Sequence, residues 1–401
     1  MKKSVVLLLA SCSEFLNVTP ENSQVADDYW RTQQDVENVL IGGYYYLRST
    51  VVDYLIPWGE CRAGLVYNAK SNTRLQTWQM QATNTSLCDW STFYKFINVA
   101  NTVLARADEA CQNDETYTEA ARNSHYSEAY FLRALSYFYL VRNFRDVPLL
   151  LEAYEDDNVV INVPKTSEDT ILTQIKADII AALETGAAKE NFATTWETKG
   201  RATRWALYAL MADVCLWSED YQKAELYCDS ILLSSSSYAP RLLTSPTHNA
   251  WFSIFNPGNS NESILELQWS EEEEQLCNLP VLFSDVDASR QYSYTRRMTE
   301  LFVDEYTYTQ QKMTEAVRTM YGGFYCSGSY VTAETGYCWK YIGSEVLTEK
   351  RTSEHYDVNF ILYRVAEVVL MKAEALIMQG RHAEAAAEIN KLRLRSNLPM
   401  V

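Results

Sequence analysis

Aromatic, amide and arginine side chains gather in two segments that lack sustained helical periodicity, residues 51–89 and 241–356. A sugar offers apolar CH faces ringed by hydroxyl groups, so an exposed aromatic ring beside amide, guanidinium or carboxylate groups is the expected chemistry of a sugar site. Long irregular loops often carry function, although a single tryptophan in such a loop can instead anchor it by packing inward. The candidate ligand-binding residues are Trp58, Tyr67, Asn68, Arg74, Trp78, Trp251, Tyr292 and Tyr294.

Motifs of the common enzyme classes are absent from the sequence. It contains no GxSxG, HExxH or phosphate-binding loop, and its 4 histidines lie far apart with no shared spacing. No CxxC pair is present, which argues against a zinc ribbon or a thioredoxin-type centre. Glycoside hydrolysis needs two carboxylates at a fixed separation, and a chance pair can arise among 52 acidic residues. We expect a non-enzymatic protein without a catalytic residue, metal site or cofactor.

The charge balance argues against a nucleic-acid partner. The chain has 35 basic and 52 acidic side chains, which give a formal net charge of -17. Binding to a phosphate backbone requires clustered Lys and Arg side chains, and no such stretch is present. Tyrosine outnumbers phenylalanine by 28 to 13, which suggests aromatic surfaces that stay partly wet, because each tyrosine ring keeps a polar atom.

The N-terminus has the pattern of a bacterial lipoprotein leader. A basic Met-Lys-Lys start precedes the apolar residues 5–10, and the run Leu-Ala-Ser-Cys ends at Cys12. We predict a signal peptide over residues 1–11, lipidation of Cys12, and a polar tether over residues 12–30. No later stretch approaches the roughly 20 apolar residues that span a bilayer, so we expect a protein anchored to the membrane and not inserted in it.

Eight cysteines follow Cys12, and an exported protein permits disulfides between them. They form no dense or regular framework, so we expect most of them to be small buried residues. Cys326 and Cys338 flank a segment rich in Gly, Ser and Tyr and are the candidate disulfide pair.

The elements that must position the candidate site are mostly helices. Apolar side chains recur at helical spacing in several stretches, and the stretch at 124–143 is apolar on more than one face, which predicts a central, buried helix. Two hairpins carry small and large residues at offsets like those of a tetratricopeptide unit. We predict helices at 35–48, 91–110, 124–143 and 167–184, helical hairpins at 203–233 and 363–395, and short strands, turns and long loops over 241–356.

The order of these elements resembles the SusD/RagB family of nutrient-binding lipoproteins. The most specific stretch is 128–149, which reads EAYFLRAL and, further on, NFRDVPL. A second is 363–393, with YRVAE, AEA and NKLR along a hairpin. Other similar stretches, in the family's order, are residues 20–44, 163–167, 200–212 and 261–269.

The resemblance implies a mainly α fold: a tetratricopeptide-like scaffold of helical hairpins with long irregular loops and short strands. It implies a single domain over 31–401, with an N-terminal half over 31–200 and a C-terminal half over 201–401. It also implies a lipid-anchored protein of the outer membrane, exposed at the cell surface. Such a protein captures an oligosaccharide in its loops and delivers it to a SusC-like, TonB-dependent transporter. The alternatives are a RagB-like peptide binder and a helical-repeat scaffold that binds a protein.

Two features depart from the family's pattern. Arg145 occupies a position where the family commonly has glycine, which should change the local backbone. The sequence also ends at Val401, directly after the hairpin, where the family continues with a further helix and an Asp-Leu-Arg-type segment. We therefore expect the C-terminal half to lack its last part.

Overall fold

The structure is a computed structural model. It describes residues 29–70, 75, 77–79, 81, 83–155, 162–319, 325–326, 336–344, 349–352 and 356–401. The predicted signal peptide, Cys12 and Arg74 lie outside these residues, and so does the side chain of Cys326.

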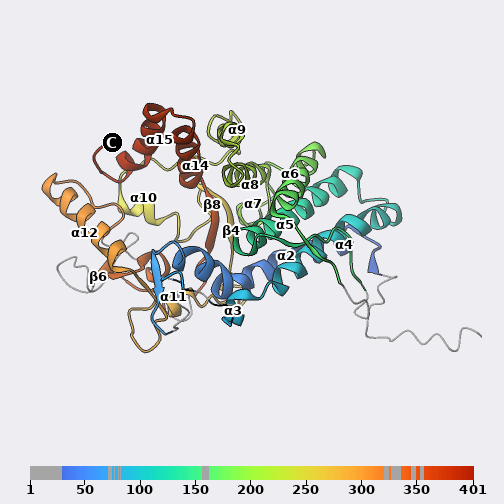
Figure 1. The fold of residues 1–401 in the computed structure, drawn as a ribbon, viewed down its shortest axis with the longest axis horizontal. Coiled ribbons are helices and arrows are strands. Elements are labelled where there is room, and N and C mark those ends of the chain that lie inside the picture. Colours follow the sequence, from blue (N-terminus) through green and yellow to red (C-terminus); the bar gives the residue numbers. More distant parts are fainter. Residues whose placement is uncertain are drawn as a thin grey trace, which may run out of the picture.

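Helices form most of the body, as predicted (Figure 1). The longer ones are α2 (Gln33–Thr50), α4 (Ser91–Asn113), α5 (Glu119–Phe144), α6 (Glu168–Glu184), α8 (Arg204–Trp217), α9 (Tyr221–Leu232), α12 (Arg296–Gln311), α14 (Val365–Met378) and α15 (His382–Arg395). The short ones are α3 (Thr85–Cys88), α7 (Thr195–Gly200), α10 (His248–Phe252), α11 (Leu279–Leu282) and α13 (Trp339–Ile342).

Eight of the longer helices form one continuous array. In the order α2, α4, α5, α6, α8, α9, α14, α15, each helix packs against the next. Both predicted hairpins, α8–α9 and α14–α15, are present, and they contact each other through α9 and α14. Segments more than 130 residues apart in the sequence therefore stack side by side, as repeat hairpins do.

Polar residues before the first turns fix where several of these helices begin. Thr32 and Asp35 form a reciprocal capping box at α2, and Thr118 and Thr203 accept from the backbone at the starts of α5 and α8. Such a side chain satisfies a backbone N–H that lacks a partner within the helix, and each is worth about 1 kcal/mol.

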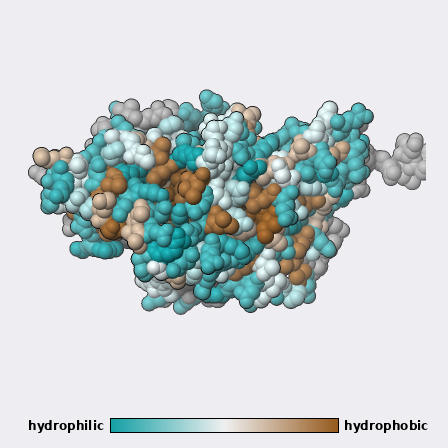
Figure 2. Space-filling model, turned by 90° about the horizontal axis from the view of Figure 1, so that it is seen from above, coloured by the Kyte–Doolittle hydropathy of each residue, from teal (hydrophilic) through white to brown (hydrophobic). Residues whose placement is uncertain are grey.

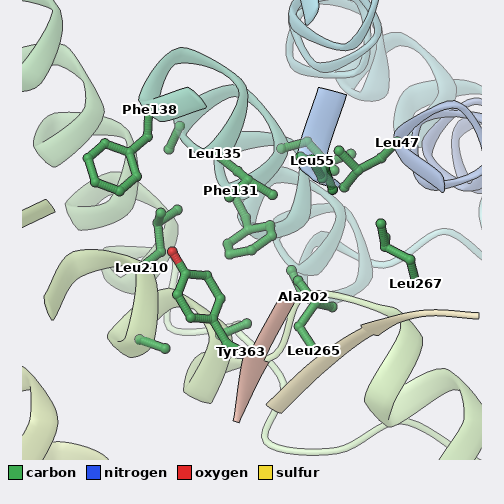
Figure 3. Packing of buried hydrophobic residues seen from close by; sticks show 14 of the residues in the cluster. Leu47, Leu55, Phe131, Leu135, Phe138, Ala202, Leu210, Leu265, Leu267 and Tyr363 are labelled. Carbon is green, nitrogen blue, oxygen red and sulfur yellow. The ribbon is translucent and has the colours of Figure 1, made fainter. Parts of the chain in front are cut away.

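Helix α5 lies in the middle of the array and is buried on most of its surface, as its apolar composition predicts. Figure 3 shows Phe131, Leu135 and Phe138 of α5 approaching Leu210 of α8 and Tyr363. A buried ion pair joins α5 to α6, with Arg133 Nη2 at 2.6 Å from Asp178 Oδ1. The α5 core therefore holds both halves of the chain together.

The prediction of an irregular segment over 51–89 is wrong for its first part. Helix α2 continues directly into η2 (Val51–Cys61), a π-helix that contains Pro57 and Gly59. These two residues disfavour a helix, but seven of the eleven side chains of η2 are buried, and this packing outweighs the local preference. π-Helical turns are frequent at functional sites.

Short strands join segments that are distant in the sequence. In the described ranges they form four antiparallel pairs: β1 (Val66–Asn68) with β5 (Tyr292–Tyr294), β2 (Val147–Pro148) with β3 (Lys165–Thr166), β4 (Ser263–Leu267) with β8 (Phe360–Arg364), and β6 (Tyr325–Cys326) with β7 (Gly336–Tyr337). β4 lies in the segment 241–356, where short strands were expected, and all of its residues are buried. Its polar Glu266 accepts from Asn359 Nδ2 at 2.7 Å.

Helix α12 was not expected, because 241–356 was read as strands and loops. Thr295 caps its start by accepting from the backbone of Met298. Only three of its sixteen residues, Thr299, Phe302 and Thr309, are buried. Phe302 packs with Met298 and Tyr306, which recur at helical spacing, so the sequence carried a helical signal that the reading of 241–356 as strands and loops missed.

The cysteines are mostly buried, as predicted. Cys61, Cys215, Cys228, Cys277 and Cys338 are buried free thiols. The hydroxyl of Tyr294 donates to Cys338 Sγ at 3.1 Å. The candidate disulfide between Cys326 and Cys338 is therefore not formed, because Cys338 is free.

Candidate functional site

The β1–β5 pair brings the two irregular segments together. Asn68 of β1 lies opposite Tyr292 of β5 in the ladder, and the N–H of Ala69 donates to the carbonyl of Gln291 at 2.7 Å. Asn68 and Tyr292, more than 200 positions apart, thus become neighbours beside η2. Successive residues of η2 then line two pockets.

The first pocket has a volume of about 690 Å³ and is here called the acidic pocket. Its described charged lining residues are Asp53 and Asp89, and none of its described lining residues is basic. The N–H of Ser91 donates to Asp89 Oδ1 at 2.8 Å and lowers the pKa of this carboxyl, which is therefore ionised at neutral pH. The lining residues are Val52, Asp53, Tyr54, Pro57, Cys61, Asn68, Leu75, Thr85, Ser86, Leu87, Asp89, Gln291 and Tyr292.

Buried rings support this pocket from behind. The Tyr292 ring is 2% exposed and stacks on Phe283 with ring centroids 5.5 Å apart. Burial raises the pKa of Tyr292, so its hydroxyl stays protonated and can both donate and accept. The thiol of Cys61 also stays protonated, because burial raises its pKa to about 12. The pocket thus offers amides, hydroxyls and carboxylates on a rigid wall, a set suited to a neutral, hydroxyl-rich ligand.

The second pocket, of about 590 Å³, is here called the arginine pocket. It contains two guanidinium groups, those of Arg62 and Arg142, together with the partly exposed indoles of Trp78 and Trp217. The lining residues are Leu55, Trp58, Gly59, Glu60, Arg62, Ala63, Leu65, Trp78, Tyr139, Arg142, Asn143, Trp217, Phe360, Ile361, Leu362 and Glu367.

Glu367 is the unusual titratable group of the arginine pocket. Burial, reinforced by the negative charge of Asp213, raises its pKa from an ordinary 4.5 to about 7. About half of the Glu367 side chains are therefore neutral at neutral pH. A neutral carboxyl does not repel an anion and can donate a hydrogen bond.

Some of the predicted binding residues line these two pockets, and others do not. Asn68 and Tyr292 line the acidic pocket, and Trp78 lines the arginine pocket with 67% of its surface exposed. Tyr67 is exposed on β1, and neither pocket includes it among its lining residues. Tyr294 ends β5 but lines neither pocket, and its hydroxyl donates to Cys338 Sγ. Arg74 lies outside the described residues.

Two of the predicted tryptophans are buried, so they do not offer the exposed ring that was expected. Trp58 lines the arginine pocket, but only 8% of its surface is exposed. Its ring stacks on Phe93, and its Nε1 donates to the carbonyl of Leu87 at 3.3 Å. Trp251 packs against Phe255 in a separate small core cluster and lines neither pocket. Both rings take the alternative role of anchoring by packing.

Several pocket residues were not predicted. Asp53, Asp89 and Gln291 lie in the same irregular segments or at their edges, so a wider search for polar side chains would have included them. Arg142 and Trp217 lie at the ends of α5 and α8, where nothing in the helical pattern separates them from surface residues.

Neither a membrane-crossing helix nor a metal cluster is found in the parts of the chain that the structure describes. No helix there is long and apolar enough to cross a membrane. No group of three or more His, Cys, Asp or Glu side chains there is arranged to hold a metal ion.

Two family models match the chain. The SusD-like model, described as starch-binding and associating with the outer membrane, matches residues 14–216, and the SusD family model matches residues 254–401. SusD-like protein P38 of Formosa agariphila is 23% identical over 437 residues, covering 98% of this chain and 80% of the relative. A SusD-like protein of Bacteroides ovatus is 24% identical over 412 residues, covering 93% and 71%.

Solved structures share the fold. A SusD superfamily protein from Bacteroides thetaiotaomicron superimposes with a TM-score of 0.73 at 22% identity, covering 93% of this chain and 82% of the other. A laminarin-binding SusD-like protein gives 0.68 at 20% identity, covering 93% and 86%. NanU of B. fragilis gives 0.68 at 21% identity, covering 94% and 80%. The predicted fold class is confirmed.

Proposed function

The chain belongs to the SusD family, and we propose that it captures an oligosaccharide at the cell surface and passes it to a SusC-like, TonB-dependent transporter. Proteins of the SusD-like family bind carbohydrate and are not catalytic, so family membership confirms the prediction of a non-enzymatic protein. The observation that carries the proposal for the ligand is the acidic pocket, in which amide, hydroxyl and carboxylate groups surround buried rings.

A neutral glycan suits the acidic pocket better than an anionic one. The carboxylates of Asp53 and Asp89 accept hydrogen bonds from sugar hydroxyls, and the amides of Asn68 and Gln291 both donate and accept. The same carboxylates repel an anion, and no described lining residue is a cation that would offset them. The description of one structural relative as laminarin-binding supports a glycan as the ligand class.

The proposal includes an anchor in the outer membrane. The description of the matching family model, associating with the outer membrane, supports this location. Lipidation of Cys12, after removal of residues 1–11, would supply the anchor, and residues 12–30 would tether the single domain over 31–401.

The face that carries α9 and α14 is the proposed contact with the transporter. Leu226 on α9 and Leu370, Ile377 and Met378 on α14 are exposed. Figure 2 shows hydrophobic patches, separated by hydrophilic surface, on the side of the molecule where these helices lie. Exposed apolar patches rimmed by polar residues are typical of protein-interaction surfaces. Leu370→Glu should lower retention on a SusC-like barrel from the same cell; unchanged retention would exclude this face.

Glycan binding is tested on a glycan array, followed by calorimetric titration of the best neutral oligosaccharide. Asn68→Ala and Gln291→Ala should each weaken binding about tenfold, because each removes roughly 1–1.5 kcal/mol of hydrogen bonding. Gln310→Ala is the matched control, an exposed amide on α12 that lines neither pocket. Equal affinity in all four proteins would exclude the acidic pocket as the binding site.

A further inference from the structure

We propose that the arginine pocket is a second saccharide subsite, selective for sugars that carry an acidic group such as a carboxylate. This inference rests on the proposed glycan-binding function and adds an acidic ligand class at a separate pocket. Within the described residues Arg62 lacks a carboxylate partner, Arg142 lies close to it, and two indoles share the pocket with them.

Arg62 has no carboxylate partner in the described part of the chain. It follows η2 directly, and its Nη1 donates to the amide oxygen of Asn143. Its Nε is buried and has no hydrogen-bond partner. A buried guanidinium nitrogen without an acceptor is costly, and a bound anion would supply the missing acceptor.

Arg142 brings a second positive charge to the same pocket. Burial and the nearness of Arg142 together lower the pKa of Arg62, which shows that the two cations act on each other. Among the described residues, Arg142 has one carboxylate contact, and it is long, 3.5 Å from its Nη1 to Asp213 Oδ2. The same Asp213 oxygen already accepts from the hydroxyl of Tyr363 at 2.8 Å. The repulsion between the two guanidinium groups would be relieved by an anion that contacts both.

The carboxyl groups of the pocket do not supply that anion. Glu60 lies 3.9 Å from Lys340 Nζ, which offsets its charge. Glu367 is largely neutral below pH 7 because of burial and Asp213. The two guanidinium charges of the pocket therefore outweigh its carboxylate charges, and the pocket attracts anions although the whole chain carries a net charge of -17.

The indoles identify the ligand as a sugar and not a simple anion. Trp78 is 67% exposed, and Arg62 Cζ lies 5.8 Å from the centroid of its ring. The backbone of Trp78 has φ of 55°, a conformation that a bulky residue seldom adopts and that clusters at ligand sites. Trp217 is held in place by a hydrogen bond from its Nε1 to Glu168 at 3.0 Å. An exposed indole can stack on the CH face of a sugar while a guanidinium pairs with its carboxylate through two parallel hydrogen bonds.

The test is calorimetric titration of the purified chain with a hexuronic acid trisaccharide and with its carboxyl-reduced, neutral counterpart. The wild-type protein should bind the acidic form at least tenfold more tightly. Arg62→Gln should abolish this preference, whereas Arg296→Gln, a control at an 87% exposed arginine of α12, should keep it. Trp78→Ala should weaken the acidic form and leave the neutral form, bound in the acidic pocket, unchanged, and the exposure of this ring makes misfolding of the variant a minor concern.

The outcomes separate this inference from the proposed function. Equal affinity for the acidic and reduced forms, or a preference that persists in Arg62→Gln, overturns the acidic subsite while leaving neutral glycan binding at the acidic pocket intact. Asn68→Ala should weaken binding of the neutral form and leave the affinity for the acidic form unchanged, so the preference for the acidic form should rise. Failure of every glycan, neutral or acidic, to bind the wild-type protein overturns the proposed function itself.

Discussion

Asn68 lies directly opposite Tyr292 in the β1–β5 ladder, although more than 200 residues separate them in the chain. Both residues line the acidic pocket. Asn68 contributes an amide, and Tyr292 contributes a ring that stacks on Phe283. The pocket therefore depends on a contact between the N-terminal and C-terminal halves, and loss of that contact should affect binding and stability together.

Tyr292→Ala should destabilise the protein by about 3 kcal/mol and abolish binding at the acidic pocket. The substitution leaves a cavity beside Phe283, and removal of a buried aromatic ring costs roughly this amount. Urea denaturation measures the change in the free energy of unfolding. Tyr67→Ala, on the paired strand but exposed, is the control and should change stability by less than about 0.5 kcal/mol. Similar effects of both substitutions would contradict the account.

The buried ion pair between Arg201 and Glu128 gives a second prediction. Arg201 donates to both carboxylate oxygens of Glu128, at 2.8 and 3.0 Å, and Tyr44 donates to the same carboxylate at 2.9 Å. Arg201→Met should lower the free energy of unfolding by about 3–5 kcal/mol, because it leaves Glu128 buried without its countercharge. The double variant with Glu128→Gln should recover part of the loss. A single variant as stable as the wild type would show that the pair is dispensable.

His125 should make the fold sensitive to acid. Burial lowers its pKa from 6.5 to about 4, and its Nδ1 lies 2.7 Å from the hydroxyl of Tyr117. Because the unfolded chain takes up this proton more readily, the stabilising contribution is present above pH 6.5 and is lost as pH falls through about 4. His125→Gln should remove up to about 3 kcal/mol of this pH dependence, measured as melting curves between pH 4 and 7. An unchanged slope would mean that His125 does not titrate in this way.

Glu367 should have the opposite effect. The pKa of Glu367 in the folded protein, about 7, lies above the ordinary value, so folding favours the protonated carboxyl. The contribution of Glu367 to the free energy of unfolding is therefore complete below pH 4.5 and is lost as pH rises through 7. Glu367→Gln should therefore be more stable than the wild type at pH 8, by about 2 kcal/mol after allowance for partial exposure, and similar to it at pH 4.5. The same substitution should make the affinity for an acidic saccharide independent of pH between 6 and 8. The charged groups that act on Glu367 are Asp213, Arg364, Arg142 and Glu60.

The helical scaffold could be predicted because its determinants are local. The apolar faces of α5 and the small residues of the α8–α9 and α14–α15 hairpins recur at helical spacing, and this spacing is readable in the sequence. η2 could not be predicted, because Pro57 and Gly59 argue locally against a helix that tertiary burial stabilises. α12 could have been predicted, because Met298, Phe302 and Tyr306 recur at helical spacing, but its segment was read as strands and loops.

The candidate site was only partly predictable. Composition pointed to the correct segments, and Asn68, Trp78 and Tyr292 all line pockets there. Composition could not distinguish the exposed Trp78 from the buried Trp58, because exposure depends on how η2 packs on Phe93. Arg62 and Arg142 share a pocket because the end of α5 lies beside η2. No local sequence pattern reveals this contact.

The most direct test of the central claim is calorimetric titration of the purified protein with the best neutral oligosaccharide from a glycan array, before and after Asn68→Ala. We predict saturable binding by the wild type, a loss of about tenfold in Asn68→Ala, and no change in the Gln310→Ala control. Binding that is absent in the wild type, or equally strong in all three proteins, would contradict capture of a glycan in the acidic pocket.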